Sequence, residues 1–186
     1  MDYAAKFPAG LAYAEFLQEF GTADHRERWA GVHERIALTD DQRTVLAGFR
    51  RRINVLCMAG AWCGDCVEQC PIFDHFERAG DAISVRFFDR DAHADLQETL
   101  TICGAARVPQ VVFLNEDFQP LGRYGDRTLS KYRQMAADKL GAFCPTGLIP
   151  PGEALMAGVV QDWLDEFERV HLIARLSPRL REKHAD

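Results

Sequence analysis

The chain has 186 residues, of which 47% are hydrophobic and 27% charged, a composition typical of one soluble globular domain. The net charge of −6, with only Arg50 to Arg52 as a basic run, disfavours nucleic acid and anionic membranes as partners. No apolar run approaches the ~20 residues of a membrane span and the N-terminus lacks a signal-peptide pattern, which favours a cytoplasmic protein.

The first fifty residues have the spacing of amphipathic helices. Apolar side chains recur every three or four positions over residues 13–20. Asp24 with Glu27 has the spacing of a capping box, so we expect a second helix to begin there. Thr39 with Gln42 has the same spacing and predicts a third helix.

Short apolar runs rich in β-forming residues then predict a sheet. We expect strands over residues 53–58, 82–89, 109–115 and 120–125, with helices between the first three. A β-α-β start requires parallel strands, and the short last connection requires an antiparallel hairpin. The order predicts an α/β fold, a four-stranded mixed sheet flanked by helices, with extra N-terminal and C-terminal helices.

The chain divides into three segments that we interpret as one globular domain. A helical extension over residues 1–52 precedes a core over residues 53–142, and a proline-containing loop and a helix occupy residues 143–186. The apolar positions of the last helix keep an alternating spacing of four and three until Pro178 ends it. We expect this helix to pack on its own domain.

Cys63 and Cys66 form a C-x-x-C between a predicted strand and a predicted helix. The first cysteine of such a motif lies where unpaired backbone N–H groups and the positive end of the helix dipole stabilise a thiolate, which is the nucleophile. The second lies one turn later, close enough to close a disulfide and release a bound substrate. Trp62, just before the pair, offers an apolar face to a partner.

The segment "AWCGDCVEQCPIFDHF" resembles the active-site segment of the thioredoxin family, and "CGAARVPQVVFL" resembles the cis-proline signature of that family. The resemblance covers roughly residues 50–142 and implies a thioredoxin-like fold. It implies that Gly64 is the motif glycine and that Pro71 occupies the kink position of the helix. It also implies a cis Val108–Pro109 bond, with Pro109 packed against the cysteine pair and Val108 backbone groups available to a peptide substrate.

Two residues depart from the family pattern. Asp65 stands where proline is commonest, and a carboxylate there opposes thiolate formation, although we expect the helix start to point it toward solvent. Cys57 stands where the family usually carries a buried aspartate, the proton acceptor for the second cysteine. The family's usual first strand is also not evident, because residues 39–52 have a helical pattern.

Six cysteines in a reducing cytoplasm are not expected to form a structural disulfide framework, and a C-x-x-C there is more often redox-active or metal-binding. Cys70 lies four residues after Cys66, and we interpret it as a small apolar packing residue, with a sulfur relay as a secondary role. Cys57, Cys103 and Cys144 are expected to be buried or incidental.

A metal site is the alternative chemistry for this segment. Zinc would have to recruit its ligands from one helix, namely Cys63, Cys66, Cys70 and His75. A continuous helix spreads these side chains around its circumference, and the iron–sulfur pattern has Gly60 where a further cysteine is needed. The sequence therefore disfavours a metal. A reduced, purely structural cysteine pair is the remaining interpretation.

The other polar residues have ordinary structural interpretations. His33 is expected to be half-buried beside the core, and His75 and His93 are expected at the surface without partners. Arg50 to Arg52 precede the first strand, whose far end carries Cys63, so we interpret them as cations at a helix C-terminus.

These features predict a thiol–disulfide oxidoreductase that reduces or exchanges protein or small-molecule disulfides. Cys63 attacks, Cys66 resolves, and Trp62 with Pro109 shapes the substrate groove. No bound cofactor is required, because electrons come from an upstream thiol reductase or a small thiol. The alternative is a thioredoxin-fold binding adaptor with vestigial redox activity, and the reactivity of Cys63 toward an alkylating agent distinguishes the two.

Overall fold

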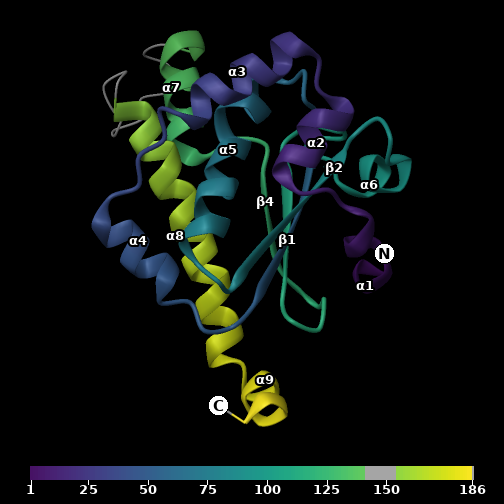
Figure 1. Cartoon of the computed structure of the whole chain (residues 1–186), viewed down its shortest axis with the longest axis vertical. Coiled ribbons are helices and arrows are strands. Elements are labelled where there is room, and N and C mark those ends of the chain that lie inside the picture. The colour runs from purple at the N-terminus through teal and green to yellow at the C-terminus, as the bar shows by residue number, and fades with distance from the viewer. Residues whose placement is uncertain (141–153, 186) are drawn as a thin grey trace.

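The computed structural model describes residues 1–140 and 154–185. In this part of the chain a four-stranded sheet has the order β2-β1-β3-β4 (Figure 1). Its strands are β1 (Ile53–Ala59), β2 (Ile83–Asp89), β3 (Gln110–Leu114) and β4 (Pro120–Gly125). β1 pairs with β2 in parallel, and the β1–β3 and β3–β4 pairs are antiparallel, which confirms the predicted mixed sheet.

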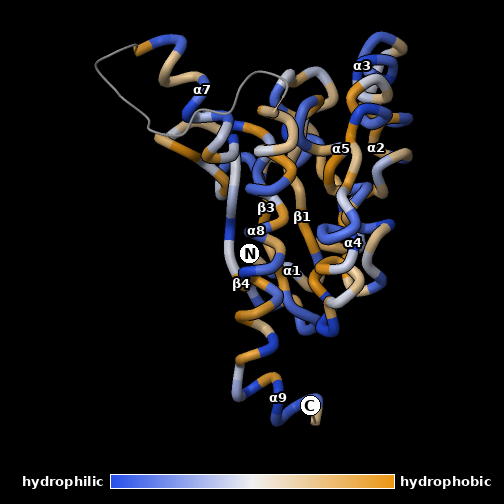
Figure 2. Tube along the Cα trace, turned by 90° about the vertical axis from the view of Figure 1, so that its left-hand side faces the viewer, coloured by the Kyte–Doolittle hydropathy of each residue, from blue (hydrophilic) through white to orange (hydrophobic). Residues whose placement is uncertain are grey.

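Helices surround this sheet on both sides. They are α1 (Tyr3–Lys6), a 3-10 turn η1 (Phe7–Ala9), α2 (Tyr13–Phe20), α3 (Ala23–His33), α4 (Asp40–Ala47), α5 (Gly64–Ala79), α6 (Ala94–Thr99), α7 (Leu129–Leu140), α8 (Ala154–Leu176) and α9 (Pro178–His184). None of these helices is long and apolar enough to cross a membrane. Along the tube in Figure 2 the inner strands β1 and β3 are hydrophobic, whereas the edge strand β4 is pale and only partly buried.

The main core lies between the sheet and the pair of helices α5 and α8. The Phe167 ring of α8 meets the Phe73 and Phe76 rings of α5 and the Phe113 ring of β3, with centroids 5.0 to 5.9 Å apart. All four side chains are fully buried. The C-terminal helix is therefore part of the central core, because it fills the space beside α5 on the same face of the sheet.

The N-terminal segment secures one edge of the sheet and the loop that follows β1. Leu11 and Phe87 exchange backbone hydrogen bonds of 2.9 and 2.7 Å, which covers the outer edge of β2. The Trp29 indole of α3 is buried and donates a 2.8 Å hydrogen bond to the carbonyl of Ala61. The N-terminal helices thus hold the backbone two residues before Cys63.

Two element boundaries differ from the sequence predictions. α3 begins after Thr22, whose hydroxyl accepts from the His25 N–H at 3.2 Å, so the predicted capping box at Asp24 is wrong. The box at Thr39 is confirmed. Pro178 does more than end α8, because Ser177 accepts from the Leu180 N–H and a short helix α9 begins at that proline.

The basic run also differs from its prediction. α4 already ends at Ala47, and Arg51 is buried at the start of β1, where it forms an ion pair with Glu116. The interpretation of Arg51 as a cation at a helix C-terminus is therefore wrong. Cys144 and the predicted boundary near residue 143 lie outside the described residues.

Candidate active site

Cys63 lies at the N-terminus of α5, as the motif predicts. It is the N-cap residue with extended backbone, and its carbonyl accepts the first helical hydrogen bond from the Val67 N–H at 2.9 Å. Its thiol is half-buried and free, whereas the thiol of Cys66, one turn later, is fully buried. Of these two thiols, only that of Cys63 can therefore meet a sulfur that arrives from solution.

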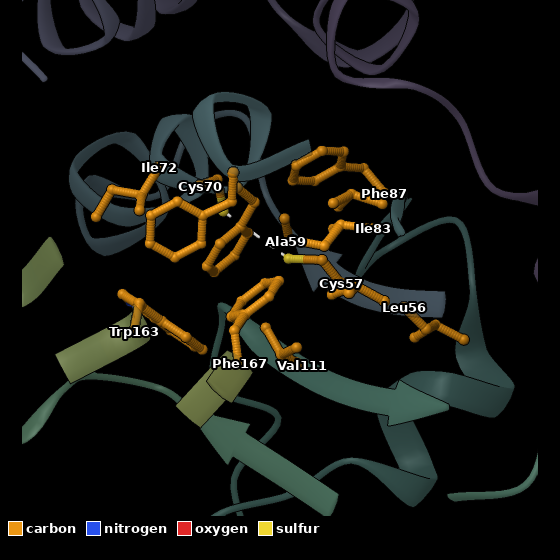
Figure 3. Close-up of a cluster of buried hydrophobic side chains, with 14 of the residues drawn as sticks. Leu56, Cys57, Ala59, Cys70, Ile72, Ile83, Phe87, Val111, Trp163 and Phe167 are labelled. Atoms are coloured by element: carbon orange, nitrogen blue, oxygen red, sulfur yellow. Dashed lines mark hydrogen bonds between the residues drawn. The ribbon is translucent and has the colours of Figure 1, made fainter. Parts of the chain in front are cut away.

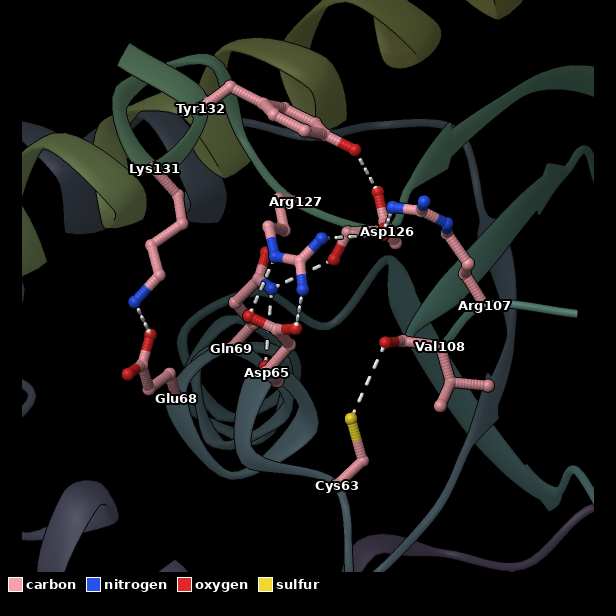
Figure 4. Close-up of polar contacts among 10 residues, drawn as sticks. All are labelled: Cys63, Asp65, Glu68, Gln69, Arg107, Val108, Asp126, Arg127, Lys131 and Tyr132. Atoms are coloured by element: carbon pink, nitrogen blue, oxygen red, sulfur yellow. Dashed lines mark hydrogen bonds and ion pairs between the residues drawn. The ribbon is translucent and has the colours of Figure 1, made fainter. Parts of the chain in front are cut away.

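The cis-proline loop faces this cysteine. The Val108–Pro109 bond is cis, which confirms the prediction from the family signature. The Cys63 Sγ lies 3.6 Å from the Val108 carbonyl oxygen, which accepts its thiol hydrogen (Figure 4). Two segments 45 residues apart in sequence thus meet at one sulfur.

The thiols of Cys63 and Cys66 interact and titrate as a pair. Burial raises the pKa of Cys66, but interactions with the Cys63 and Cys70 thiols and the hydrogen bond from the Gly60 N–H at 3.5 Å outweigh burial and lower it to about 5. The interaction with Cys66, together with burial, raises the pKa of Cys63. The two sulfurs therefore share one negative charge.

Asp65 does not point to solvent, and that prediction is wrong. Its carboxylate forms a two-pronged ion pair with the guanidinium of Arg127, with Nε 3.0 Å from Oδ1 (Figure 4). The negative charge of Asp65 raises the pKa of Cys66. Arg127, which follows β4, offsets that charge, so a residue far along the chain adjusts the electrostatics of the dithiol.

Asp126 is a second, more deeply buried carboxylate beside the groove. It accepts hydrogen bonds from the Tyr132 hydroxyl, from Arg127 at 3.0 Å and from Arg107 at 3.3 Å. Burial alone would raise the pKa of Asp126, but the Tyr132 hydroxyl and the two guanidiniums outweigh burial and lower it. The carboxylate is therefore held ionised as the anchor for both arginines.

Gln69 connects this network to the C-terminal helix. Its Nε2 donates to the Asp126 carbonyl at 2.9 Å and to the Asp65 carbonyl at 3.2 Å. Its Oε1 accepts from the buried Trp163 indole of α8 at 3.0 Å. These groups belong to α5, to the residue that follows β4 and to α8, and together they fix the start of α5 against β4 and α8.

Trp62 is exposed over 43% of its surface and is held at the rim of the site. Arg90 directly follows β2, and its guanidinium lies 4.5 Å from the centre of the Trp62 ring. A Cβ atom at Gly60 would lie 2.8 Å from the same ring, so glycine leaves the space that the ring occupies. Gly64, in contrast, has no neighbour among the described residues that a Cβ atom would meet, so no contact with them requires a glycine there.

A groove of about 480 Å³ runs past the exposed sulfur. Among the residues that line it are Trp62, Cys63, Asp65, Arg90, Val108 and Arg127. Four of these six residues were predicted from the sequence, whereas Arg90 and Arg127 were not. Both could have been found from topology, because β1, β2 and β4 run in one direction and their carboxyl ends meet at one edge.

Behind the groove, the remaining predicted residues are buried. Pro71 lies inside α5, where it has no N–H to donate to the Val67 carbonyl. Cys57 lies in β1 with its Sγ 3.9 Å from the Sγ of Cys70. Pro109 is buried at the start of β3, next to the Val108 carbonyl that faces Cys63.

The histidines have partners that the sequence did not predict. His33 is half-buried as expected, but its Nε2 lies 2.7 Å from the Asp74 carboxylate. The His75 ring stacks on His33 with centroids 4.1 Å apart, and His93 lies 3.3 Å from the Lys6 ammonium, so the expectation of two partnerless histidines is wrong. Among the described residues, no three histidine, cysteine or acidic side chains converge as metal ligands would.

Comparisons with known proteins agree with this architecture. A family model described as thioredoxin matches residues 10–139. The crystal structure of a protein of unknown function from Pseudomonas aeruginosa is 24% identical with a TM-score of 0.70, covering 90% of this chain and 98% of that one. An HIV epitope scaffold is 22% identical with a TM-score of 0.63, covering 88% and 98%.

No curated protein matches the chain. At these identities the two solved structures show the shared fold alone. The family model, however, spans well over half of the sequence and includes both the C-x-x-C and the cis-proline segments. The chain therefore belongs to the thioredoxin-like family.

Proposed function

We propose that the protein is a thiol–disulfide oxidoreductase that works through the Cys63–Cys66 dithiol. One observation carries this proposal: a half-exposed thiol at a helix N-terminus, one turn before an enclosed second thiol and facing the carbonyl of a cis-proline loop. The different exposure of the two thiols assigns their roles. Cys63 meets the substrate, and Cys66 reaches the substrate only by attacking the Cys63 sulfur once the substrate is bound to it.

The reaction is two thiol–disulfide exchanges. The Cys63 thiolate attacks one sulfur of the substrate disulfide, and the other sulfur leaves as a thiolate and takes up a proton. The Cys66 thiolate then attacks the Cys63 sulfur, closes the Cys63–Cys66 disulfide and releases the second substrate thiolate. The dithiol loses two electrons and the substrate gains them. A small thiol or an upstream thiol reductase restores the dithiol, and no bound cofactor is needed.

The surface around the sulfur favours a protein or peptide disulfide over a highly charged ligand. Trp62 exposes a large apolar side chain in the groove, and Tyr132 exposes another beside it, in contact with Asp126 and Arg127. The charged residues between them are already paired with one another, as Asp65 is with Arg127. The net charge of −6 also disfavours nucleic acid as a partner. We propose that the reaction takes place in the cytoplasm.

Reduction of insulin disulfides by a small thiol tests the proposal. The wild-type protein should accelerate the reduction, and Cys63→Ser should abolish the acceleration because the attacking thiolate is gone. Cys66→Ser should instead accumulate mixed disulfides on Cys63. Cys103→Ser is the matched control, since that cysteine is exposed and does not line the groove.

Two outcomes would contradict these assignments. Mixed disulfides trapped on Cys66 in the Cys63→Ser variant would exchange the two roles. A wild-type rate no higher than that of Cys63→Ser, with ordinary slow alkylation of Cys63 at neutral pH, would favour a binding adaptor instead.

A further inference from the structure

A second pair of thiols lies directly behind the first. Cys57 of β1 and Cys70 of α5 are both fully buried, and their sulfurs face each other at 3.9 Å (Figure 3). A disulfide bond is ~2.05 Å long, so the two sulfurs need to approach by about 2 Å to form one. The proposed reaction uses neither of these thiols.

This inner pair is connected to the outer one through Cys66. Cys66 lies one turn after Cys63 and one turn before Cys70 along α5. Cys66 and Cys70 are both fully buried, and the interaction between their thiols shifts the pKa of each. The four sulfurs therefore follow one another from the groove to the core, in the order Cys63, Cys66, Cys70 and Cys57.

Burial decides how the inner pair can react. Neither Cys57 nor Cys70 has any exposed surface, so a dissolved oxidant or a substrate disulfide cannot reach them. Cys66 is the sulfur of the outer pair that comes next to Cys70 along α5. Packing alone needs only small apolar side chains at positions 57 and 70, whereas both residues here carry thiols that face each other.

We propose that Cys57 and Cys70 are a second, internal redox couple that receives the disulfide of the Cys63–Cys66 pair by intramolecular exchange. The proposal rests on the proposed function, because the first disulfide must form at Cys63. It makes the protein a carrier of two disulfides, one accessible to partners and one stored in the core.

The exchange has two steps. The Cys70 thiolate attacks the Cys66 sulfur, which forms a Cys66–Cys70 bond and releases Cys63 as a thiolate that takes up the proton lost by Cys70. The Cys57 thiolate then attacks the Cys70 sulfur and releases Cys66, which takes up the proton lost by Cys57. The inner pair loses two electrons and the outer pair gains two, so no further oxidant is consumed.

The transfer frees Cys63 for a second substrate and leaves a disulfide that joins β1 covalently to α5. Burial raises the pKa of both Cys57 and Cys70, so few of these thiols are ionised at neutral pH. We therefore expect the transfer to follow the first oxidation as a separate, slower phase.

Disulfide mapping over time tests the proposal. The fully reduced protein is mixed with excess oxidised glutathione, quenched in acid, alkylated after denaturation and mapped by mass spectrometry. The Cys63–Cys66 linkage should form first and the Cys57–Cys70 linkage later. The alkylated cysteines should fall from the six in the sequence to two, Cys103 and Cys144.

Three variants define the route. Cys66→Ser keeps both inner thiols but removes the connecting sulfur, so the Cys57–Cys70 linkage should not form. Cys57→Ala and, independently, Cys70→Ala should stop after one disulfide with the outer linkage intact. Cys103→Ser is the matched control and should still form both linkages.

The outcomes separate this proposal from the proposed function. A wild-type protein that forms Cys63–Cys66 and nothing further in excess oxidant would overturn the internal couple and leave the oxidoreductase proposal standing. A protein that forms neither linkage would overturn both. Formation of Cys57–Cys70 in Cys66→Ser at the wild-type rate would show direct oxidation and overturn the relay.

Discussion

At the scale of single residues, the reactivity of the dithiol depends on one ion pair. The Asp65 carboxylate raises the pKa of Cys66, and the Arg127 guanidinium that contacts it offsets part of this effect. Both side chains are mostly buried, so solvent screens their charges less than at an open surface. Removing either charge should therefore change the ionisation of the thiols, and in opposite directions.

Arg127→Gln should raise the pH at which the dithiol reaches half of its maximal alkylation rate, by up to about one unit. Asp65→Asn should lower that pH, and the double variant should lie near the wild-type value because neither charge remains. The pH dependence of iodoacetamide reaction at Cys63 measures this effect. Arg43→Gln, on the distant helix α4, is the charge-matched control. An unchanged midpoint in Arg127→Gln would show that the ion pair has no electrostatic role.

Cys57, in place of the buried aspartate that the family usually has at that position, predicts slow resolution of the mixed disulfide. Once Cys63 is bound to substrate, it no longer carries the thiol hydrogen whose interaction lowers the pKa of Cys66. Cys57 cannot accept the Cys66 proton at neutral pH, because burial raises the pKa of its thiol and keeps it protonated. The resolution rate should therefore rise with pH between about 6 and 9, the range around a free thiol pKa of ~8.5.

Single-turnover kinetics across that range measure the resolution rate. Cys57→Asp should accelerate resolution at neutral pH while lowering the free energy of unfolding, since a buried carboxylate is costly. A rate that does not depend on pH would show that deprotonation of Cys66 is not limiting.

The sequence predicted those site residues whose roles are set by local spacing. Cys63, Cys66, Val108 and Pro109 belong to two short motifs, so their arrangement follows from a strand, a turn and the start of a helix. The partner of Asp65 lies 62 residues away, and only the sheet topology brings it there. No local pattern could indicate that pairing, which is why Asp65 was expected in solvent.

At the scale of elements, α8 contributes to the same core as the active-site helix. Phe167→Ala should lower the free energy of unfolding by about 3–5 kcal/mol, because it removes a fully buried ring between α5 and β3. Urea unfolding measures the loss, and Glu168→Ala, exposed on the same helix, is the control. A loss below about 1 kcal/mol would show that α8 is only weakly packed.

Helices and strands were predicted correctly where a single sequence pattern dominates. The strand predictions end within about one residue of the observed strands, because a short apolar run between turn residues leaves few alternatives. The helix α9 was missed because proline excludes the interior of a helix but is favoured at its first position. Pro178 satisfies both rules at once, and only the Ser177 cap identifies it as a start.

At the scale of the whole molecule, buried histidines set the response to acid. His171 of α8 is buried, stacks on Phe49 and accepts a 3.0 Å hydrogen bond from the Arg50 N–H. Burial, with the nearby Arg175 and Arg51, lowers the pKa of His171. At pH values between 6.5, the pKa of histidine in the unfolded chain, and the lower pKa of His171 in the folded protein, the unfolded chain binds more protons than the folded protein does. The contribution of His171 to the free energy of unfolding is therefore complete above pH 6.5 and is lost as the pH falls.

His171→Gln should reduce the loss of stability on going from pH 7 to pH 5, because glutamine accepts the same hydrogen bond and does not titrate. Urea unfolding at both pH values measures the difference within each protein, so a constant offset between variants does not matter. The loss should not vanish, since the pKa values of His75 and His93 are also lowered by burial. An equal or larger loss in the variant would contradict the assignment.

The three tryptophans give the dithiol its own optical signal. Trp62 adjoins Cys63 and is exposed to solvent, whereas Trp29 and Trp163 are buried and donate hydrogen bonds to the loop before α5 and to Gln69 within α5. A soluble quencher such as acrylamide should therefore reach only the first of them, and the unquenched emission should come from the other two. The intrinsic fluorescence therefore distinguishes changes at the groove, which affect Trp62, from changes around α5, which affect Trp29 and Trp163. No added label is needed.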